Sequence, residues 1–395
     1  MLNLNAPKIT FKGNYAFHST DVLLNGKKRK LWFKVKKEHA DLLSDTSDAA
    51  ALALLIPAMF HKTDLYIDGV FSEKLYHNFI TRLQIVLQKI IPQLSPVKVF
   101  AKNLTNKNSN NYKGVATALS CGVDSFAVIA DYYKTELPKN YQITHFIFNN
   151  VGQHGDDNSL ENSSKLFEKR YFNNLKVANY LNLPLVYVDS NLDEYYREID
   201  LNHRQTHLLR NSCVAHLLSL GIDKFYYASA YEYEDIAIKE SKAIAISDPI
   251  LLPLLSSDLL ETISIGCEYS RIEKTFKISQ YVYTYNNLDV CVKSDSSSAG
   301  NCSVCKNCLI TQLTLDLLDR LVLYNNVFDL DKYINVKSKF MAKVMVSNQP
   351  LFKELKNYIE ENNIEVSNDV KKHIRVIKRK KFKELVFRNF KKLLP

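Results

Sequence analysis

Short apolar runs alternate with longer amphipathic stretches over the middle of the chain. The runs have the length of buried strands and lie at 115–119, 143–148, 185–188 and 225–228. The stretches between them carry apolar residues at helical spacing: one begins near Phe126, and the others span 160–181 and 205–220. This alternation predicts an α/β fold, a parallel, doubly wound sheet covered by helices on both faces.

The segment 1–110 follows a different pattern. Leu31, Phe33 and Val35 recur at every second position, the period of a half-buried strand. Apolar residues at helical spacing over 75–90, with Ser72 placed to cap them, predict a helix. Because the polar stretch 103–111 is typical of a linker, we expect a separate small α+β domain at 1–110, a central domain at 111–325 and a helical segment at 326–395.

Composition places the chain among ordinary soluble proteins and localises its charge. Of its 395 residues 46% are apolar and 24% charged, and the net charge is +10. The segment 331–395 holds 17 Lys or Arg and 7 Asp or Glu, so it accounts for the whole surplus. The N-terminus lacks the pattern of a signal peptide, and no apolar run is long enough to span a membrane. We therefore expect a cytoplasmic protein without a transmembrane segment.

The basic surplus is densest between Lys371 and Lys392, with eleven basic residues and one acid, Glu384. An apolar stripe at helical spacing accompanies it, formed by Phe382, Leu385, Val386, Phe390 and Leu393. Three interpretations stay open: a helix docked by this stripe, a contact with tRNA or another nucleic acid, and binding to a partner or membrane surface.

The segment Leu119-Ser120-Cys121-Gly122-Val123-Asp124-Ser125 lies between a predicted strand and a predicted helix. Such a turn offers free backbone N–H groups and the positive end of the helix dipole to an anion. The hydroxyls of Ser120 and Ser125 add donors, and Gly122 allows a phosphate to approach the backbone. The alternative is a capped turn with no ligand.

Four of the seven cysteines follow the spacing C-x10-C-x2-C-x2-C: Cys291, Cys302, Cys305 and Cys308. Thiolates at this spacing suit a tetrahedral Zn²⁺ ion, and four of them leave no open coordination position. We therefore expect a structural zinc knuckle at 291–308, with Cys267 as the reserve ligand. Buried free thiols, a redox pair and an iron–sulfur cluster are the alternatives.

The loop resembles the Ser-Gly-Gly-x-Asp-Ser loop of the PP-loop ATP pyrophosphatases, with Cys121 in place of the first glycine. Loop and cysteines together resemble the 7-cyano-7-deazaguanine synthase branch of that family, over roughly residues 113–320. The resemblance implies that ATP binds at Ser120, Cys121, Gly122, Val123, Asp124 and Ser125, and Asn149, at the end of a predicted strand, could line the adenine pocket. It implies that substrate binds at Arg210, Asn211, Glu234 and Asp235, and that Mg²⁺ accompanies the nucleotide, with Asp124 catalytic.

Two further sets of residues are weaker candidates. Arg271 and Lys274 lie three residues apart on one predicted helix, where they could complete a phosphate site or form a solvated ion-pair face with Glu273. His154 follows a strand end and could line an adenine pocket or sit at a loop tip. His203 and His207 have the spacing of a metal pair, although no acidic residue stands between them as in a zincin.

The leading hypothesis is an enzyme that uses ATP to adenylate a small carboxylate, such as 7-carboxy-7-deazaguanine, and passes the acyl group to ammonia or an amine. A protein or tRNA is a possible acceptor, and the oligomeric state stays open. One alternative is a tRNA-thiolating PP-loop enzyme with Cys121 or Cys213 as its reactive thiol. The other is a zinc-stapled nucleotide-binding module without catalysis.

Overall fold

The computed structural model describes residues 1–395 except 25, 107–112, 155–159, 292–299 and 394–395, and describes only the backbone of 160–162 and 385–393. The described residues form two compact units, one of 1–120 with 124–268 and the other of 121–123 with 269–395. Among them, no helix has both the length and the apolar character needed to cross a bilayer. Most of the predicted linker lies outside the described residues, and its beginning belongs to a strand, β6 (Val99–Thr105).

The predicted parallel sheet is the centre of the first unit. Its strands are β7 (Gly114–Ala118), β8 (His145–Asn149), β9 (Leu185–Ser190), β10 (Ile222–Ala228) and β11 (Glu261–Ile265). They run in the order β11-β10-β7-β8-β9, and every neighbouring pair is parallel. Most of their residues are buried because helices cover both faces, which confirms the predicted α/β class.

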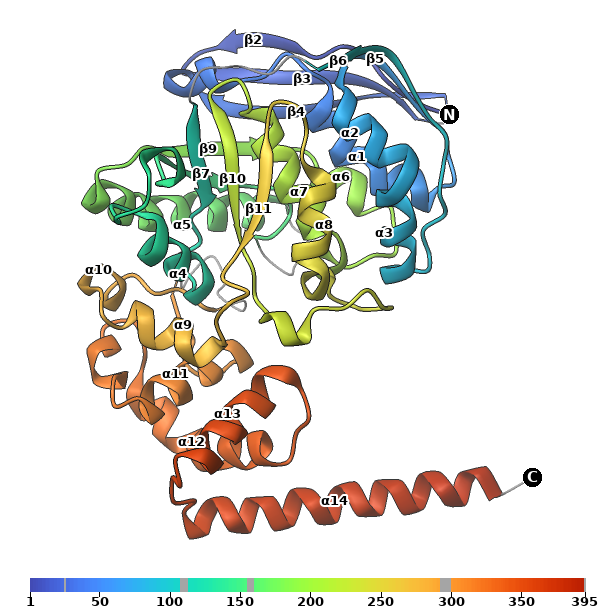
Figure 1. Ribbon diagram of the computed structural model, residues 1–395. Coiled ribbons are helices and arrows are strands. Elements are labelled where there is room, and N and C mark those ends of the chain that lie inside the picture. Colours follow the sequence, from blue (N-terminus) through green and yellow to red (C-terminus); the bar gives the residue numbers. More distant parts are fainter. Residues whose placement is uncertain (25, 107–112, 155–159, 292–299, 394–395) are drawn as a thin grey trace. The chain divides into compact units, whose positions relative to one another are not determined.

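The covering helices come from the amphipathic stretches. They are α4 (Val123–Tyr132), α5 (Leu160–Leu181), α6 (Asp193–Tyr196), α7 (His203–Leu217) and α8 (Asp248–Leu255). Helices α4 and α5 lie on one face of the sheet, and α7 and α8 lie on the other (Figure 1). The chain therefore winds in both directions from the middle strand β7.

The strands of the segment 1–110 belong to the same sheet as the parallel strands, and the segment lies within the first unit. Its strands are β1 (Leu2–Leu4), β2 (Lys8–Lys12), β3 (Tyr15–Leu24), β4 (Lys27–Lys36), β5 (Leu65–Ser72) and β6. Strand β4 pairs antiparallel with β9, for example Val35 with Val188, and the order continues β4-β3-β1-β5-β6. Strand β9 would otherwise be an edge with unpaired backbone groups, and this pairing extends the sheet to eleven strands.

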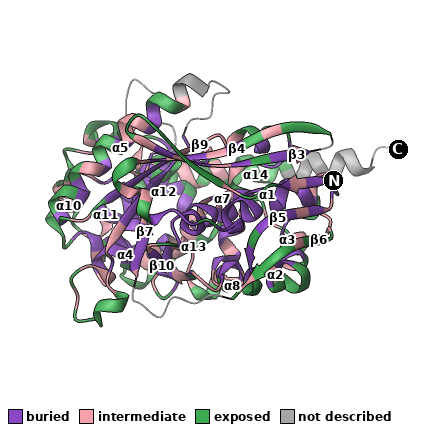
Figure 2. Cartoon of the chain, turned by 90° about the horizontal axis from the view of Figure 1, so that it is seen from above, coloured by how far each residue is buried: buried purple, intermediate pink, exposed green. Residues whose placement is uncertain are grey.

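Helix α1 (Asp48–Phe60) is buried along almost its whole length and packs against α7 (Figure 2). Its Asp48 carboxylate is fully buried, and burial raises its pKa to about 6. The backbone N–H of Ser72 donates to Asp48 at 2.9 Å, and the Ser72 hydroxyl donates to it too. Ser72 therefore holds α1 instead of capping the predicted helix, which forms as α2 (Glu73–Asn78), a π turn and α3 (Gln84–Ile90).

The second unit is helical around its own apolar clusters. Its helices are α9 (Arg271–Ile278), α10 (Val282–Tyr285), α11 (Lys306–Leu317), α12 (Leu330–Met345), α13 (Pro350–Glu361) and α14 (Asn368–Leu393). Leu313 of α11 shares one cluster with Phe340 of α12 and Leu355 of α13. This cluster therefore contains residues from both sides of the predicted boundary at residue 325.

Candidate functional site

The strand order of the first unit reverses between β7 and β10, since the chain builds β8 and β9 on one side of β7 and β10 and β11 on the other. Open α/β sheets bind ligands outside the carboxyl ends of the strands at such a reversal. The predicted nucleotide loop 119–125 follows β7, and the segment that carries the predicted substrate residues Glu234 and Asp235 follows β10.

The loop after β7 is fixed from both sides. The backbone N–H of Leu119 donates to the Ile147 carbonyl at 2.9 Å, and the side-chain amide of Asn174 donates to the Leu119 carbonyl at 3.0 Å. Farther along, the Ser120 hydroxyl donates to the Ser125 hydroxyl at 3.2 Å. The loop therefore reaches the start of α4 in one defined conformation, which suits a rigid binding surface.

Exposure alternates along this loop. Ser120 is exposed, Gly122 and Asp124 are partly exposed, and Cys121 and Ser125 are buried. Ser120, Gly122 and Asp124 thus lie at least partly at the surface beside the first turn of α4. They belong to the segment that the sequence predicts for an anion, and Asp124 adds a carboxylate of the kind that can hold a divalent cation.

Cys121, at the position of the missing glycine, has a φ of +56°. This left-handed conformation is the one that glycine adopts without cost, so the backbone keeps a glycine-like shape with a cysteine side chain. Burial raises the pKa of the Cys121 thiol well above its usual value. Burial also raises the pKa of the Cys213 thiol, in the interior of α7. Neither sulfur has the thiolate character that the thiolation alternative requires.

Asn149, at the carboxyl end of β8, contacts a predicted substrate residue directly. Its side-chain amide donates to Oδ1 of Asn211 on α7 at 3.2 Å. Its own carbonyl oxygens, main-chain and side-chain, each accept a bond from the Gln153 amide at 2.6 Å. Asn211 also hydrogen-bonds Tyr227 of β10, whose pKa burial raises well above its usual value. The predicted nucleotide and substrate residues Asn149 and Asn211 therefore belong to one polar network.

Arg210 is buried and paired. Its Nη2 lies 2.5 Å from Oδ1 of Asp193, at the start of α6, and its guanidinium stacks 4.3 Å from the centre of the Tyr196 ring. Gly152 has a φ of +99°, and a Cβ there would clash with both Arg210 and Asp193. Asp193 neutralises much of the charge that Arg210 would offer to a substrate. The sequence pattern does not indicate this role of Asp193.

The three candidate histidines are held neutral. His154 is 3% exposed, its Nε2 lies 3.0 Å from the Asn149 carbonyl oxygen, and burial lowers its pKa to about 4. His207 Nδ1 lies 2.7 Å from the Tyr227 hydroxyl, and burial lowers its pKa to about 4. His203 stacks on His207, and burial lowers its pKa as well. His154 therefore lies in the interior, not at a loop tip, and the described residues supply no third ligand for a His203–His207 metal pair.

The segment after β10 carries the predicted acidic residues. Glu234 is exposed and Asp235 partly exposed, in the short turn Tyr233–Asp235. The turn is tied to the segment after β11 by the Tyr233 N–H, which donates to the Cys267 carbonyl at 2.9 Å. Both carboxylates thus follow β10, one of the two strands between which the strand order reverses.

The predicted phosphate pair begins α9 in the second unit, whereas Asp124 belongs to the first unit. Ser270 and Glu273 cap α9 reciprocally, with the Ser270 N–H donating to Glu273 at 2.8 Å. Lys274 is fully buried and Arg271 is partly buried. Lys274 therefore does not belong to a solvated ion-pair face with Glu273, because the Glu273 carboxylate caps the helix and the lysine is buried.

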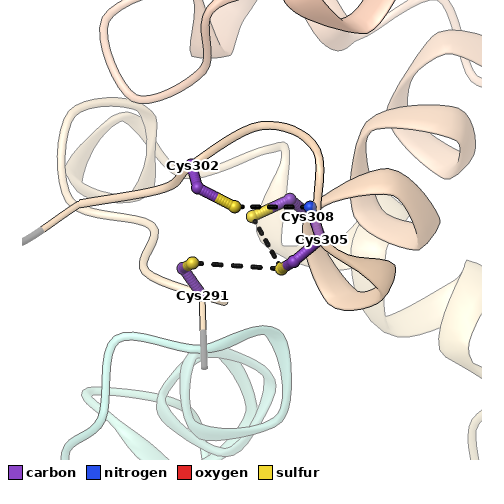
Figure 3. A group of neighbouring side chains, drawn as sticks. All are labelled: Cys291, Cys302, Cys305 and Cys308. Atoms are coloured by element: carbon purple, nitrogen blue, oxygen red, sulfur yellow. Dashed lines mark hydrogen bonds between the residues drawn. The ribbon is translucent and has the colours of Figure 1, made fainter. Parts of the chain in front are cut away.

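The four predicted zinc ligands come together in the second unit, as Figure 3 shows. Their Sγ atoms all lie within 4.8 Å of one another, with 3.9 Å from Cys291 to Cys305 and 3.4 Å from Cys305 to Cys308. Sulfurs bound tetrahedrally about 2.3 Å from Zn²⁺ would be ~3.8 Å apart. Cys267 belongs to the first unit and lies near Ser264, so the reserve ligand is not used.

Hydrogen bonds orient this cysteine group. The Cys305 N–H donates to Cys302 Sγ at 3.3 Å, as in a zinc knuckle, and the hydrogen bond with Cys308 lowers the pKa of Cys305. Asn301, absent from the sequence prediction, accepts from the Val290 N–H at 2.9 Å and donates to the Leu288 carbonyl at 2.7 Å. Asn301 thereby joins the segment just before Cys291 to the segment that carries Cys302. The donor set suits a four-coordinate metal ion with no open position.

Comparison of the chain with protein-family models, with curated proteins and with solved structures returned no match.

Proposed function

We propose that the protein adenylates a small carboxylate with ATP and transfers the acyl group to ammonia or an amine. The observation that carries the proposal is the position of the loop 119–125 at the β7/β10 reversal, with the segment of Glu234 and Asp235 after β10. Both the sheet position and the loop chemistry suit a nucleotide phosphate.

The loop residues have distinct roles in this proposal. Ser120 and the backbone at Gly122 bind phosphate oxygens, and the first turn of α4 adds its dipole. Asp124 is the candidate ligand for Mg²⁺, which when bound would neutralise phosphate charge. Asn149 and Asn211 orient the base and the substrate through their shared network, and Glu234 with Asp235 offers acceptors for N–H groups of a heterocyclic acid such as 7-carboxy-7-deazaguanine.

The chemistry needs positioning more than reactive side chains. The substrate carboxylate oxygen attacks the α phosphorus, the bond to the bridging oxygen breaks, and pyrophosphate leaves. An amine then attacks the acyl carbon of the mixed anhydride, loses a proton and displaces AMP, giving an amide. Charge on the transferring phosphorus has to be stabilised, which the backbone N–H groups at the start of α4 and a bound Mg²⁺ ion would do.

The cysteine group has a structural role in this proposal. Four thiolates fill the coordination of Zn²⁺, so the ion would hold Cys291 together with Cys302, Cys305 and Cys308 without touching substrate. ATP and Mg²⁺ are then the cofactors of the reaction, and zinc is part of the fold.

The test is to incubate the purified protein with ATP, Mg²⁺, ammonium and a panel of small carboxylic acids that includes 7-carboxy-7-deazaguanine. We expect AMP and pyrophosphate in equal amounts, and an acyl-adenylate or amide by mass spectrometry. Asp124→Asn should abolish AMP formation at unchanged melting temperature, while Asp200→Asn, at an exposed position, should not. ATP binding without AMP under every condition would favour the non-catalytic module instead.

A further inference from the structure

Helix α14 carries a dense run of basic residues on a helix that is itself anchored. Between 371 and 383 the chain has eight Lys or Arg and no Asp or Glu, and all eight side chains are exposed: Lys371, Lys372, Arg375, Lys378, Arg379, Lys380, Lys381 and Lys383. We name this set the α14 basic surface. It lies on one uninterrupted helix (Figure 1).

Three apolar residues of α14 pack within the second unit. Val370, Ile374 and Ile377 recur at helical spacing and pack with Met341 of α12 and Ile359 of α13. Lys381 Nζ also donates to the Val346 carbonyl, just after α12, at 2.9 Å. The helix is therefore held through residue 381, and the apolar stripe that holds it is not the predicted one. In the predicted stripe, Phe382 is 67% exposed and the other side chains lie outside the described residues.

The α14 basic surface is hardly neutralised by the protein. Lys372 lies 3.4 Å from Asp369, and it is the one member that forms an ion pair with a described residue. Eight positive charges over thirteen residues at ~1.5 Å per residue give about one charge per 2.5 Å of helix. Duplex DNA carries one negative charge per ~1.7 Å of its axis, a comparable density.

We propose that the α14 basic surface binds the phosphate backbone of double-stranded nucleic acid without reading its sequence. A membrane-surface helix would need a free apolar face beside its basic face. Val370, Ile374 and Ile377 instead pack with α12 and α13, and over 371–383 the exposed side chains are the eight basic residues with Val376 and Phe382. This inference is independent of the adenylation chemistry.

The experiment measures fluorescence anisotropy of a 20-base-pair DNA duplex and an RNA duplex of equal length with the full chain. We expect a dissociation constant in the micromolar range or tighter at 50 mM NaCl and a steep loss of affinity by 200 mM. The variant Lys378→Glu/Arg379→Glu/Lys380→Glu should bind at least tenfold more weakly, and its salt slope should fall by roughly three. Binding to either duplex or to both supports the proposal and tells DNA from RNA.

The matched control reverses three exposed lysines on the first unit, Lys12→Glu/Lys27→Glu/Lys28→Glu, and so changes the net charge equally. It should bind like the parent chain. The glutamine version of the α14 variant, with an unchanged melting temperature, guards against a folding defect. Equal weakening by both triple variants, absence of duplex binding at 50 mM NaCl, or binding confined to phosphatidylserine-containing vesicles would overturn the proposal.

Discussion

The side-chain amide of Asn149 donates to Oδ1 of Asn211 across 3.2 Å, joining the carboxyl end of β8 to helix α7. Two residues assigned to different ligands, one to the nucleotide and one to the substrate, are thus coupled in the free protein. A ligand that displaces either amide has to replace this hydrogen bond.

A double-mutant cycle measures the coupling. Asn149→Ala and Asn211→Ala should each lower the free energy of unfolding, because each leaves a polar partner unpaired. The double variant should be more stable than the sum of the two losses predicts, by about 1 kcal/mol. Urea unfolding of the four proteins gives this number. Additive losses would mean that the two amides do not interact.

Cys121 offers a test of the glycine-like loop, since its φ of +56° is left-handed. Both Cys121→Ala and Cys121→Gly remove the thiol. The alanine variant keeps the Cβ and with it the backbone strain, whereas the glycine variant has no Cβ and no such strain. The glycine variant should therefore be the more stable of the two by about 1 kcal/mol in chemical denaturation.

The same two substitutions at Cys213 are the control, because that buried cysteine lies inside α7 with helical neighbours. There the alanine variant should be the more stable, by about 1 kcal/mol. An alanine preference at both sites would argue against a left-handed backbone at Cys121.

The sequence predicts those parts of the fold that leave a local pattern. The strands β7 to β10 are short apolar runs, α5 is amphipathic, and both follow from spacing alone. Helix α1 leaves no such signal because it is apolar on every side and so has no period. The pairing of β4 with β9 joins residues about 150 positions apart, and nothing local in either strand marks its partner.

The site divides in the same way. The loop 119–125 and the four cysteines are visible in the sequence because their chemistry is compressed into a few adjacent residues. Asp193 and Asn174 are not, because their partners, Arg210 and Leu119, are brought to them only by the tertiary fold. The burial of Lys274 depends on neighbours that no helical spacing reveals.

The cysteine group predicts one zinc ion per chain. Metal analysis of protein purified without added metal should give a stoichiometry near one, and Cys308→Ser should lose the ion, because three thiolates hold Zn²⁺ far less tightly than four. Strong chelators should lower the melting temperature of the parent chain, since the bound ion stabilises the folded state.

Cys267→Ser is the matched variant, because Cys267 is also buried but lies in the first unit, outside the group. It should keep the full zinc content. Loss of the ion in both variants would point to a general folding defect, and full content in Cys308→Ser would refute the assigned ligand set.

The lowered pKa of His154 leads us to expect that the free energy of unfolding depends on pH. Burial lowers its folded-state pKa to about 4, below the ordinary value of about 6.5, so as the pH falls the unfolded chain binds this proton first. The contribution is complete above pH ~6.5, and it falls by about 3 kcal/mol as the pH drops to 4. His154→Gln should therefore flatten the fall in unfolding free energy over this window by up to ~1.4 kcal/mol per pH unit.

Phe167→Leu, which alters the ring packed 5.0 Å from His154, is the control: it should lower the free energy of unfolding at every pH without changing the slope. Parallel curves for the parent chain and His154→Gln would show that this imidazole takes up its proton equally in both states.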